Sequence, residues 1–308
     1  MATAALLQRV FGGRPSFART PDGVSTQVYR VFRGTGTFYL RVAEEPGDDL
    51  RTEADLHDRL RGLGVRVAEV VHVEPFVAGI DRSVLITTEV PGTSLAEVGN
   101  PVAAVTVAEE AGRDLALLGT VPVDGYGFVR RCGPGWPLHA EYPRHDAFVT
   151  SDLPRPWPGA LAALFGGRDL ESLHGLVERE RACPPDRAAL AHGDFDVTPI
   201  FCADGRYTGL IDLGEIRGAE PLFDLGHFLL HDRETLPVTL LPAVLRGYQH
   251  VRPLPADHAA TIRRSAVLLG LRQLCRWLGP PRGFGLDHPA VVGRARRISH
   301  LLGAAPPA

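Results

Sequence analysis

The sequence predicts an α+β fold in two parts: a small antiparallel sheet with one helix over residues 1–90, and a larger, mainly helical part over residues 91–308. Two observations support this division. The first ninety residues are rich in alternating and β-branched runs, whereas apolar residues beyond them recur mostly with the period of a helix. A chain of 308 residues is also long enough to bury the core of one large or two modest domains.

Strand patterns account for most of the first part. Residues 25–42 alternate apolar and polar side chains around an Arg-Gly-Thr-Gly turn at 33–36, which is typical of an antiparallel hairpin. The runs 65–75 and 82–90 are bounded by Pro75 and by a Pro-Gly pair at 91–92, and they predict the remaining strands. The small sheet should therefore end near residue 90.

One helix is expected between these strands. Leu56, Leu60 and Leu63 follow each other at the i, i+4 and i+7 positions of a helix, and Gly64 stands where a helix commonly stops. The pattern predicts a short amphipathic helix whose three leucines face the sheet.

The second part is predominantly helical in its patterning. Residues 105–118, which end at Gly119, and residues 261–278 show the clearest helical periodicity. Residues 199–213 instead predict a hairpin with an Asp-Gly turn. The stretch 132–158, rich in Pro and Trp, is too interrupted for long elements and is interpreted as a surface excursion or a substrate loop.

Composition excludes several classes of function. The net charge of −3 does not suit a nucleic-acid-binding protein, and no charge-free stretch is long enough for a membrane span. The amino end lacks the features of a signal peptide, so a cytoplasmic location is expected. All 33 basic residues are Arg, which excludes lysine Schiff-base chemistry and the GxxxxGK[ST] phosphate loop. The spacing of the four cysteines matches no zinc site or redox pair.

Acidic residues concentrate between residues 191 and 228, beside apolar strands. Asp194 precedes the predicted hairpin at 199–213 and Asp212 lies at its end, so the hairpin should bring the two carboxylates to the same end of a small sheet. Two acids in that position suit a general base and a magnesium ligand, because Mg²⁺ takes one or two carboxylates and leaves its other positions to phosphate and water.

Two short motifs contain these aspartates: His-Gly-Asp at 192–194 and Ile-Asp-Leu-Gly at 211–214. They match the catalytic and metal-binding motifs of the aminoglycoside phosphotransferase family, which the chain resembles and which has a protein-kinase-like fold. The segment 221–225, PLFDL, is similar to the stretch whose aspartate, here Asp224, braces the catalytic loop. The resemblance extends over roughly residues 20–300, and it implies an N-lobe at 1–90 and a C-lobe at 91–308.

The resemblance implies phosphoryl transfer from ATP or GTP, with Mg²⁺, to a hydroxyl of a small molecule. Asp194 would orient that hydroxyl and accept its proton, and Asp212 would hold Mg²⁺ against the nucleotide phosphates. Arg41, steadied by Glu53, would contact the α- and β-phosphates in the place of the usual lysine.

The same resemblance assigns further nucleotide contacts. The backbone N–H groups of Ser25 and Thr26 would close over the phosphates. The Thr88 carbonyl and the Val90 N–H would bind the adenine edge. Glu215 would support the metal site without binding the metal directly.

Two positions depart from the family pattern. Pro199 stands where the family has an asparagine that binds metal, so either Asp196 or Thr198 supplies the missing oxygen, or the site holds a single metal. The phosphate-covering segment also contains only one glycine, Gly23.

Two other functions remain open at this point. One is a catalytically weak, pseudokinase-like protein that binds a nucleotide or another ligand, as the departures suggest. The other is a metal-dependent hydrolase, in which His192, Asp194 and Asp196 form a cluster completed by His227 and His231, one helical turn apart.

The charge of the acceptor can also be addressed. From residue 224 onward, where the family builds its acceptor pocket, the chain has 11 Arg against five acids. A polycationic substrate would prefer a surface lined by carboxylates. The sequence therefore predicts a neutral or weakly cationic hydroxyl compound, an antibiotic (which would make the enzyme a resistance factor) or a metabolite. Four acids, Glu141, Asp146, Asp152 and Asp232, could still serve a cationic one. The oligomeric state is not predicted.

Overall fold

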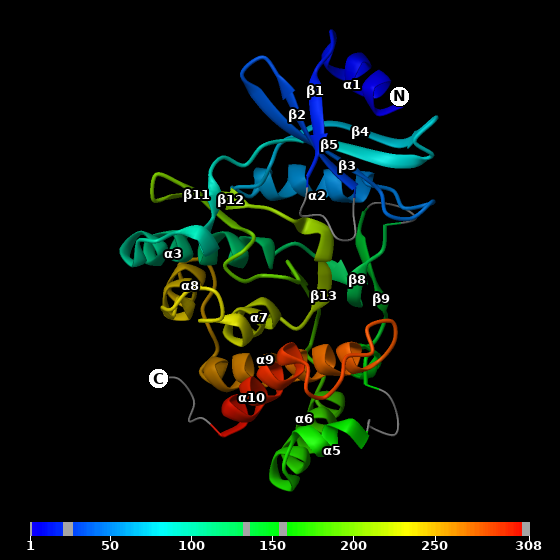
Figure 1. The fold of residues 1–308 in the computed structure, drawn as a ribbon. Helices are drawn as coiled ribbons and strands as arrows, with labels where there is room; N and C mark the ends of the chain where they lie inside the picture. Colours follow the sequence, from blue (N-terminus) through cyan, green and yellow to red (C-terminus); the bar gives the residue numbers. More distant parts are fainter. Residues whose placement is uncertain (1, 21–26, 132–135, 154–158, 304–308) are drawn as a thin grey trace.

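A computed structural model describes residues 2–20, 27–131, 136–153 and 159–303. Figure 1 shows a twisted sheet with two helices at one end of the molecule and a larger, mainly helical assembly beneath it. None of the helices in the described ranges combines the length and hydropathy that a membrane crossing requires. The α+β architecture is thus the one that the sequence predicts.

The amino-terminal sheet is antiparallel, with the strand order β1-β2-β3-β5-β4. Its strands are β1 (Ser16–Arg19), β2 (Gln27–Arg33), β3 (Gly36–Val42), β4 (Val70–Val77) and β5 (Arg82–Thr88). The predicted hairpin is confirmed, because Arg33 pairs with Gly36 across the turn between β2 and β3. The predicted end at Pro75 is wrong: β4 begins at Val70 and continues through Pro75, where its register against β5 shifts. Such an irregularity lets a strand accept a proline that cannot donate a hydrogen bond.

Helices cover both faces of this sheet. Leu40, Val84 and Ile86 face helix α1 (Ala2–Phe11), whereas Leu85, between the last two, packs with Ala54 of α2 (Arg51–Gly62) on the other face. This alternation follows from the two-residue period of a strand. Helix α1 is additional to the single helix that the sequence predicts.

The predicted leucine stripe of α2 is only partly correct. Leu56 and Leu60 are fully buried. Leu63 lies beyond the last helical residue and is 45% exposed, because the chain turns away at Gly64, whose φ is +86°. The helix ends one residue too early to bury its third leucine.

The larger part contains eight helices within the described ranges, and the two predicted ones are confirmed. They are α3 (Pro101–Leu118), α4 (His145–Thr150), α5 (Gly159–Leu164), α6 (Gly167–Ala182), α7 (Phe223–His231), α8 (Leu241–Gln249), α9 (His258–Leu278) and α10 (Pro289–Gly303). Helix α3 begins with the proline that follows the capping residue Asn100, whose side chain accepts a hydrogen bond from the Val102 N–H.

Two small sheets lie among these helices. One has the order β10-β13-β8-β9-β7, and the other has the order β12-β11-β6. Their strands are β6 (Thr93–Ser94), β7 (Val123–Asp124), β8 (Tyr126–Val129), β9 (Leu138–Tyr142), β10 (Ala189–Ala191), β11 (Ile200–Ala203), β12 (Arg206–Leu210) and β13 (Arg217–Ala219). The β11–β12 hairpin is the one predicted at residues 199–213, with its turn at Asp204 and Gly205.

The interpretation of residues 132–158 as a surface excursion is wrong for the residues that the structure describes. Strand β9 and helix α4 come from this stretch, and Leu138, Phe148 and Val149 are at most 2% exposed. The prolines interrupt the elements, but the apolar residues between them are buried in the core.

The β11–β12 hairpin connects the two parts of the molecule. The Leu210 N–H donates a hydrogen bond to the Arg66 carbonyl, and Val67 forms an isolated bridge with Leu210. The leucines of α2 share a hydrophobic cluster with Leu210 and Leu213. The chain end of this hairpin is therefore held directly beneath α2.

Replacing Gly247 by alanine should destabilise the fold by about 1–3 kcal/mol, because α3 and α8 cross with their backbones in contact. A Cβ at Gly247 would lie 1.7 Å from the Glu109 carbonyl oxygen, and one at Gly112 would lie 2.1 Å from the Val244 oxygen. The matched control is Gly175→Ala in the exposed face of α6, where a Cβ meets nothing within 4 Å. Urea denaturation should show a loss for the first variant and a gain of up to about 1 kcal/mol for the second; equal effects would contradict the helix contact.

Candidate active site

The loop that follows β10 carries the His-Gly-Asp motif. His192 is fully buried, and its Nε2 lies 2.9 Å from the Ile211 carbonyl oxygen, to which it donates a hydrogen bond. Gly193 has a φ of +93°, and a Cβ there would lie 2.0 Å from the Glu215 carbonyl oxygen. Only glycine tolerates both constraints. The loop is thus joined to the segment that contains Asp212, as the hairpin argument predicts.

Asp224, at the start of α7, braces this loop from below. Its carboxylate accepts hydrogen bonds from the His192 and Gly193 N–H groups, at 2.8 Å and 2.9 Å. Burial raises the pKa of Asp224, and the two N–H donors oppose that effect. The position agrees with the bracing role that the PLFDL segment implies.

Asp194 projects from the loop with a side chain that is 57% exposed. Its Oδ1 lies 3.3 Å from Nε2 of His227, on α7. The hydrogen bond from His227 is the main reason that the pKa of Asp194 falls to about 2, and burial opposes it. Asp194 is therefore an ionised, accessible carboxylate at neutral pH.

Asp212 follows strand β12 in a left-handed backbone conformation, with a φ of +60°. Aspartate adopts this conformation more readily than most residues. Within the described residues its carboxylate has no ion pair or hydrogen bond, and it lies at the wall of a cavity. A free carboxylate oxygen is the kind of ligand that Mg²⁺ binds.

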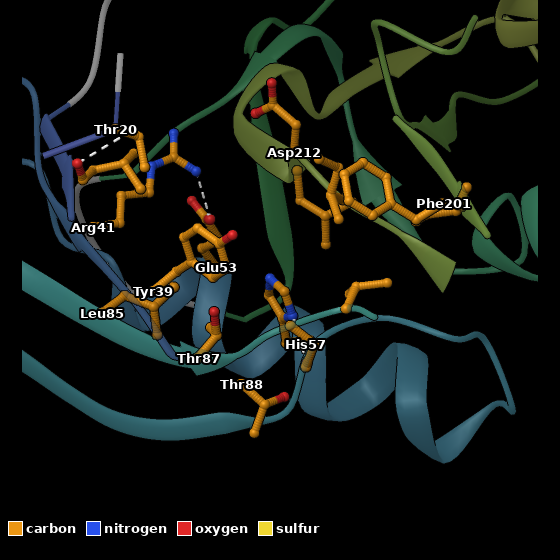
Figure 2. A pocket seen from close by; sticks show the side chains of 16 residues that line it. Thr20, Tyr39, Arg41, Glu53, His57, Leu85, Thr87, Thr88, Phe201 and Asp212 are labelled. Carbon is orange, nitrogen blue, oxygen red and sulfur yellow. Dashed lines mark hydrogen bonds and ion pairs between the residues drawn. The ribbon is translucent and has the colours of Figure 1, made fainter. Parts of the chain in front are cut away.

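The cavity lies between the amino-terminal sheet and the β11–β12 hairpin and has a volume of about 450 Å³ (Figure 2). Its lining comes from both parts of the molecule. The lining residues are Thr20, Val28, Tyr39, Arg41, Glu53, His57, Ala68, Leu85, Thr87, Thr88, Val90, Phe201, Leu210, Ile211, Asp212 and Leu213. Mixed polar and apolar walls of this size fit a small ligand with a planar apolar portion and a charged portion.

Arg41 and Glu53 form an ion pair on one wall, shown as a dashed line in Figure 2. Arg41 Nη1 lies 2.6 Å from Glu53 Oε1, and the side chains are 16% and 5% exposed. Arg41 Nε is buried without a hydrogen-bond partner among the described residues. Arg41 itself lines the cavity, so the accessible part of its guanidinium is suited to an incoming acceptor such as a phosphate oxygen.

Of the other predicted nucleotide contacts, the structure describes two and leaves two outside the described residues. Thr88 and Val90 line the cavity, as expected of residues that bind a base. The Thr88 hydroxyl accepts a hydrogen bond from the Glu69 N–H, which joins the end of β5 to the residue before β4. Ser25 and Thr26 lie outside the described residues.

Asp196 and Thr198 are the candidates for the missing metal ligand. Neither is among the described residues that line the cavity. Asp196 Oδ1 instead accepts a hydrogen bond of 2.6 Å from the Thr198 N–H. Glu215 pairs with Arg217 at 2.8 Å.

Two histidines near the site make contacts that the sequence does not predict. His57 follows Glu53 by four residues on α2, and this spacing alone could have placed it in the cavity. Its Nδ1 donates to the Ala68 carbonyl, and burial lowers its pKa. His227, considered earlier as a metal ligand, contacts Asp194 instead.

The alternative of a histidine–aspartate metal cluster finds no support among the described residues. Among the described residues, no group of three or more His, Cys, Asp or Glu side chains could hold a metal ion. His192, His227 and His231 are each engaged with a carbonyl or carboxylate oxygen.

Comparisons with known proteins agree with this architecture. A thermostable mutant of aminoglycoside phosphotransferase APH(4)-Ia, solved with AMP-PNP and hygromycin B, has a TM-score of 0.71 and 16% identity, covering 98% of each chain. Amicoumacin kinase hAmiN, solved with AMP-PNP, Ca²⁺ and Ami, has a TM-score of 0.63 and 15% identity, covering 94% of this chain and 89% of that one. A search of curated protein sequences finds no match.

The kinase-like fold is thus shared with proteins of very different sequence. The profile of the APH phosphotransferase enzyme family matches residues 16–261, which include the cavity and both aspartates. With the fold and most of the sequence in agreement, the chain belongs to the phosphotransferase enzyme family.

Proposed function

We propose that this phosphotransferase moves the γ-phosphoryl group of ATP or GTP to a hydroxyl of a small molecule, with Asp194 as the base and Asp212 as a magnesium ligand. The observation that carries the proposal is the cavity itself. Arg41 and Asp212 both line it, and the Asp212 carboxylate has no partner among the described residues; we place the cavity between an N-lobe and a C-lobe divided near residue 90.

The nucleotide would place its base near Thr88 and Val90 and its phosphates near Arg41 and Asp212. Arg41 is held by Glu53, so its guanidinium would bind phosphate oxygens without first being ordered. When bound, Mg²⁺ neutralises the charge of the phosphates. Ser25 and Thr26 are retained as further phosphate contacts, and Asp196 or Thr198 as further metal ligands.

Asp194 would orient the acceptor hydroxyl for attack on the γ-phosphorus. Its exposed carboxylate is joined to the metal-binding segment through the hydrogen bond between His192 and the Ile211 carbonyl. Catalysis of this kind consists mainly of positioning and charge stabilisation, so no covalent nucleophile is required.

The acceptor is proposed to be neutral or to carry few positive charges. Of the acids that could bind a cation, Asp152 pairs with both Arg272 and Arg276. Arg272 is only 5% exposed, although its place on the flank of α9 predicts a solvated side chain. The remaining three are also engaged: Asp146 with Arg144, Glu141 with the Phe128 N–H, and Asp232 with Thr239 and the Leu240 N–H.

A thermal-shift screen tests the nucleotide part of the proposal. ATP with Mg²⁺ should raise the melting temperature, because a ligand at 100 times its Kd stabilises the fold by about 2.7 kcal/mol. Neither Zn²⁺ alone nor the buffer should do so. Stabilisation and turnover that require Zn²⁺ but no nucleotide would favour the hydrolase instead.

An acceptor panel tests the transfer itself. ATP consumption should be stimulated by a hydroxyl compound among nucleoside antibiotics, peptide antibiotics or amino alcohols. Nucleotide binding without any turnover would favour the pseudokinase-like protein. Strong, selective turnover of a highly cationic aminoglycoside would contradict the proposed acceptor class.

A further inference from the structure

One face of helix α7 holds the catalytic loop at two points. Asp224 and His227 are three residues apart, so their side chains lie on the same face of the helix. Asp224 accepts hydrogen bonds from the N–H groups at the start of the loop. His227 contacts the next two residues: its Nδ1 lies 3.1 Å from the Phe195 carbonyl oxygen and its Nε2 lies 3.3 Å from Asp194 Oδ1.

Both contacts of His227 are with hydrogen-bond acceptors. A carbonyl oxygen and an ionised carboxylate oxygen have no proton to give, so each needs a donor from the ring. A neutral imidazole has one N–H and can satisfy only one of them, whereas the imidazolium has two. The side chain of His227 is 8% exposed, so solvent has little access to replace either bond.

The surroundings of His227 contain charges of both signs. Asp194 of the loop contacts it, Asp224 and His231 interact with it from its own helix, and His192 lies on the same loop as Asp194. The ring of His231 stacks on it with a centroid distance of 4.6 Å. His231 in turn contacts Glu234, which pairs with Arg294 of α10. The charge of Glu234 is balanced by Arg294, so the two aspartates remain to favour a cation at His227.

We propose that His227, as an imidazolium, is a positioning residue that holds the Asp194 carboxylate by Oδ1 and leaves Oδ2 for the acceptor hydroxyl. It fixes Asp194 relative to the loop backbone, because the same ring is anchored to the Phe195 carbonyl. The inference rests on the proposed role of Asp194 in phosphoryl transfer. It also explains why a histidine pair resembling a metal motif lies beside the catalytic loop.

Kinetics of two variants test the positioning role. His227→Leu should lower kcat about 10–100-fold and leave KM for ATP unchanged, because a misplaced catalytic group costs rate rather than nucleotide affinity. His227→Gln, which can still donate to Asp194, should recover most of the loss. His300→Leu, at an exposed histidine of α10, is the control and should keep kcat within about threefold. An unchanged kcat in His227→Leu would overturn the proposal.

Nitrogen NMR of the histidine-labelled full chain tests the protonation directly and does not depend on turnover. In the wild type both ring nitrogens of His227 should carry protons at pH 7, with the signal assigned by its loss in His227→Gln. In Asp194→Ala, Nε2 should lose its proton at the same pH. A neutral ring in the wild type would overturn the proposal. If the wild type transfers no phosphate to any acceptor, the proposed function fails, while this measurement still decides the contact.

Discussion

Replacing Asp194 by alanine should lower the rate of phosphoryl transfer about 10²–10⁴-fold, the usual contribution of a positioned general base. The side chain is 57% exposed, and its contact with His227 is the only ion pair it makes among the described residues. The loop is held separately, through its backbone by Asp224 and through the His192 ring by the Ile211 carbonyl. We therefore expect the fold and the affinity for ATP with Mg²⁺ to remain close to those of the wild type.

Single-turnover kinetics would separate chemistry from binding in this variant. Asp186→Ala, at an exposed acid between α6 and β10, is the matched control and should retain the wild-type rate. If Asp194→Ala retained the rate within a few fold while binding nucleotide normally, the carboxylate would not be the base.

Replacing Asp212 by alanine should abolish the Mg²⁺-dependent part of ATP binding. The carboxylate lines the cavity without a partner among the described residues, so its removal takes away a metal ligand rather than a structural contact. In calorimetric titrations with ATP, the affinity of the wild type for ATP should rise when Mg²⁺ is added. The affinity of the variant should not.

A second substitution at this position separates charge from backbone strain. Residue 212 has a φ of +60°, which alanine adopts less readily than aspartate or asparagine. Asp212→Asn keeps the shape, the backbone preference and one possible oxygen ligand but loses the charge, so it should weaken the Mg²⁺ dependence with a smaller change in melting temperature. Retained wild-type Mg²⁺ dependence in Asp212→Ala would exclude the proposed metal ligand.

The sequence was sufficient for features that depend on neighbours along the chain. The β2–β3 and β11–β12 hairpins are set by alternation and by Gly-containing turns, and helices α3 and α9 by their periodicity. The two aspartates are brought to adjoining segments by one of these hairpins. Arg41 and Glu53 could be paired because the family resemblance supplies a lysine–glutamate pair at the same places.

Features that depend on tertiary contacts could not be predicted in this way. The polar and apolar pattern of α1 does not say that Leu6 and Leu7 will cover the outer face of the sheet. The role of His227 depends on where α7 passes beneath the loop, which no spacing in the sequence specifies.

Gly193, just before Asp194, and Gly214, just after Asp212, differ in what surrounds them. At Gly193 an added methyl group would strike the main chain of Glu215, whereas at Gly214 it would meet the tips of the Arg41 and Asp212 side chains, 2.8 Å and 3.0 Å away. Main chain cannot yield there, but side-chain tips can rotate. In a mutational library, residues other than glycine should therefore be lost at position 193, whereas small residues should be tolerated at position 214.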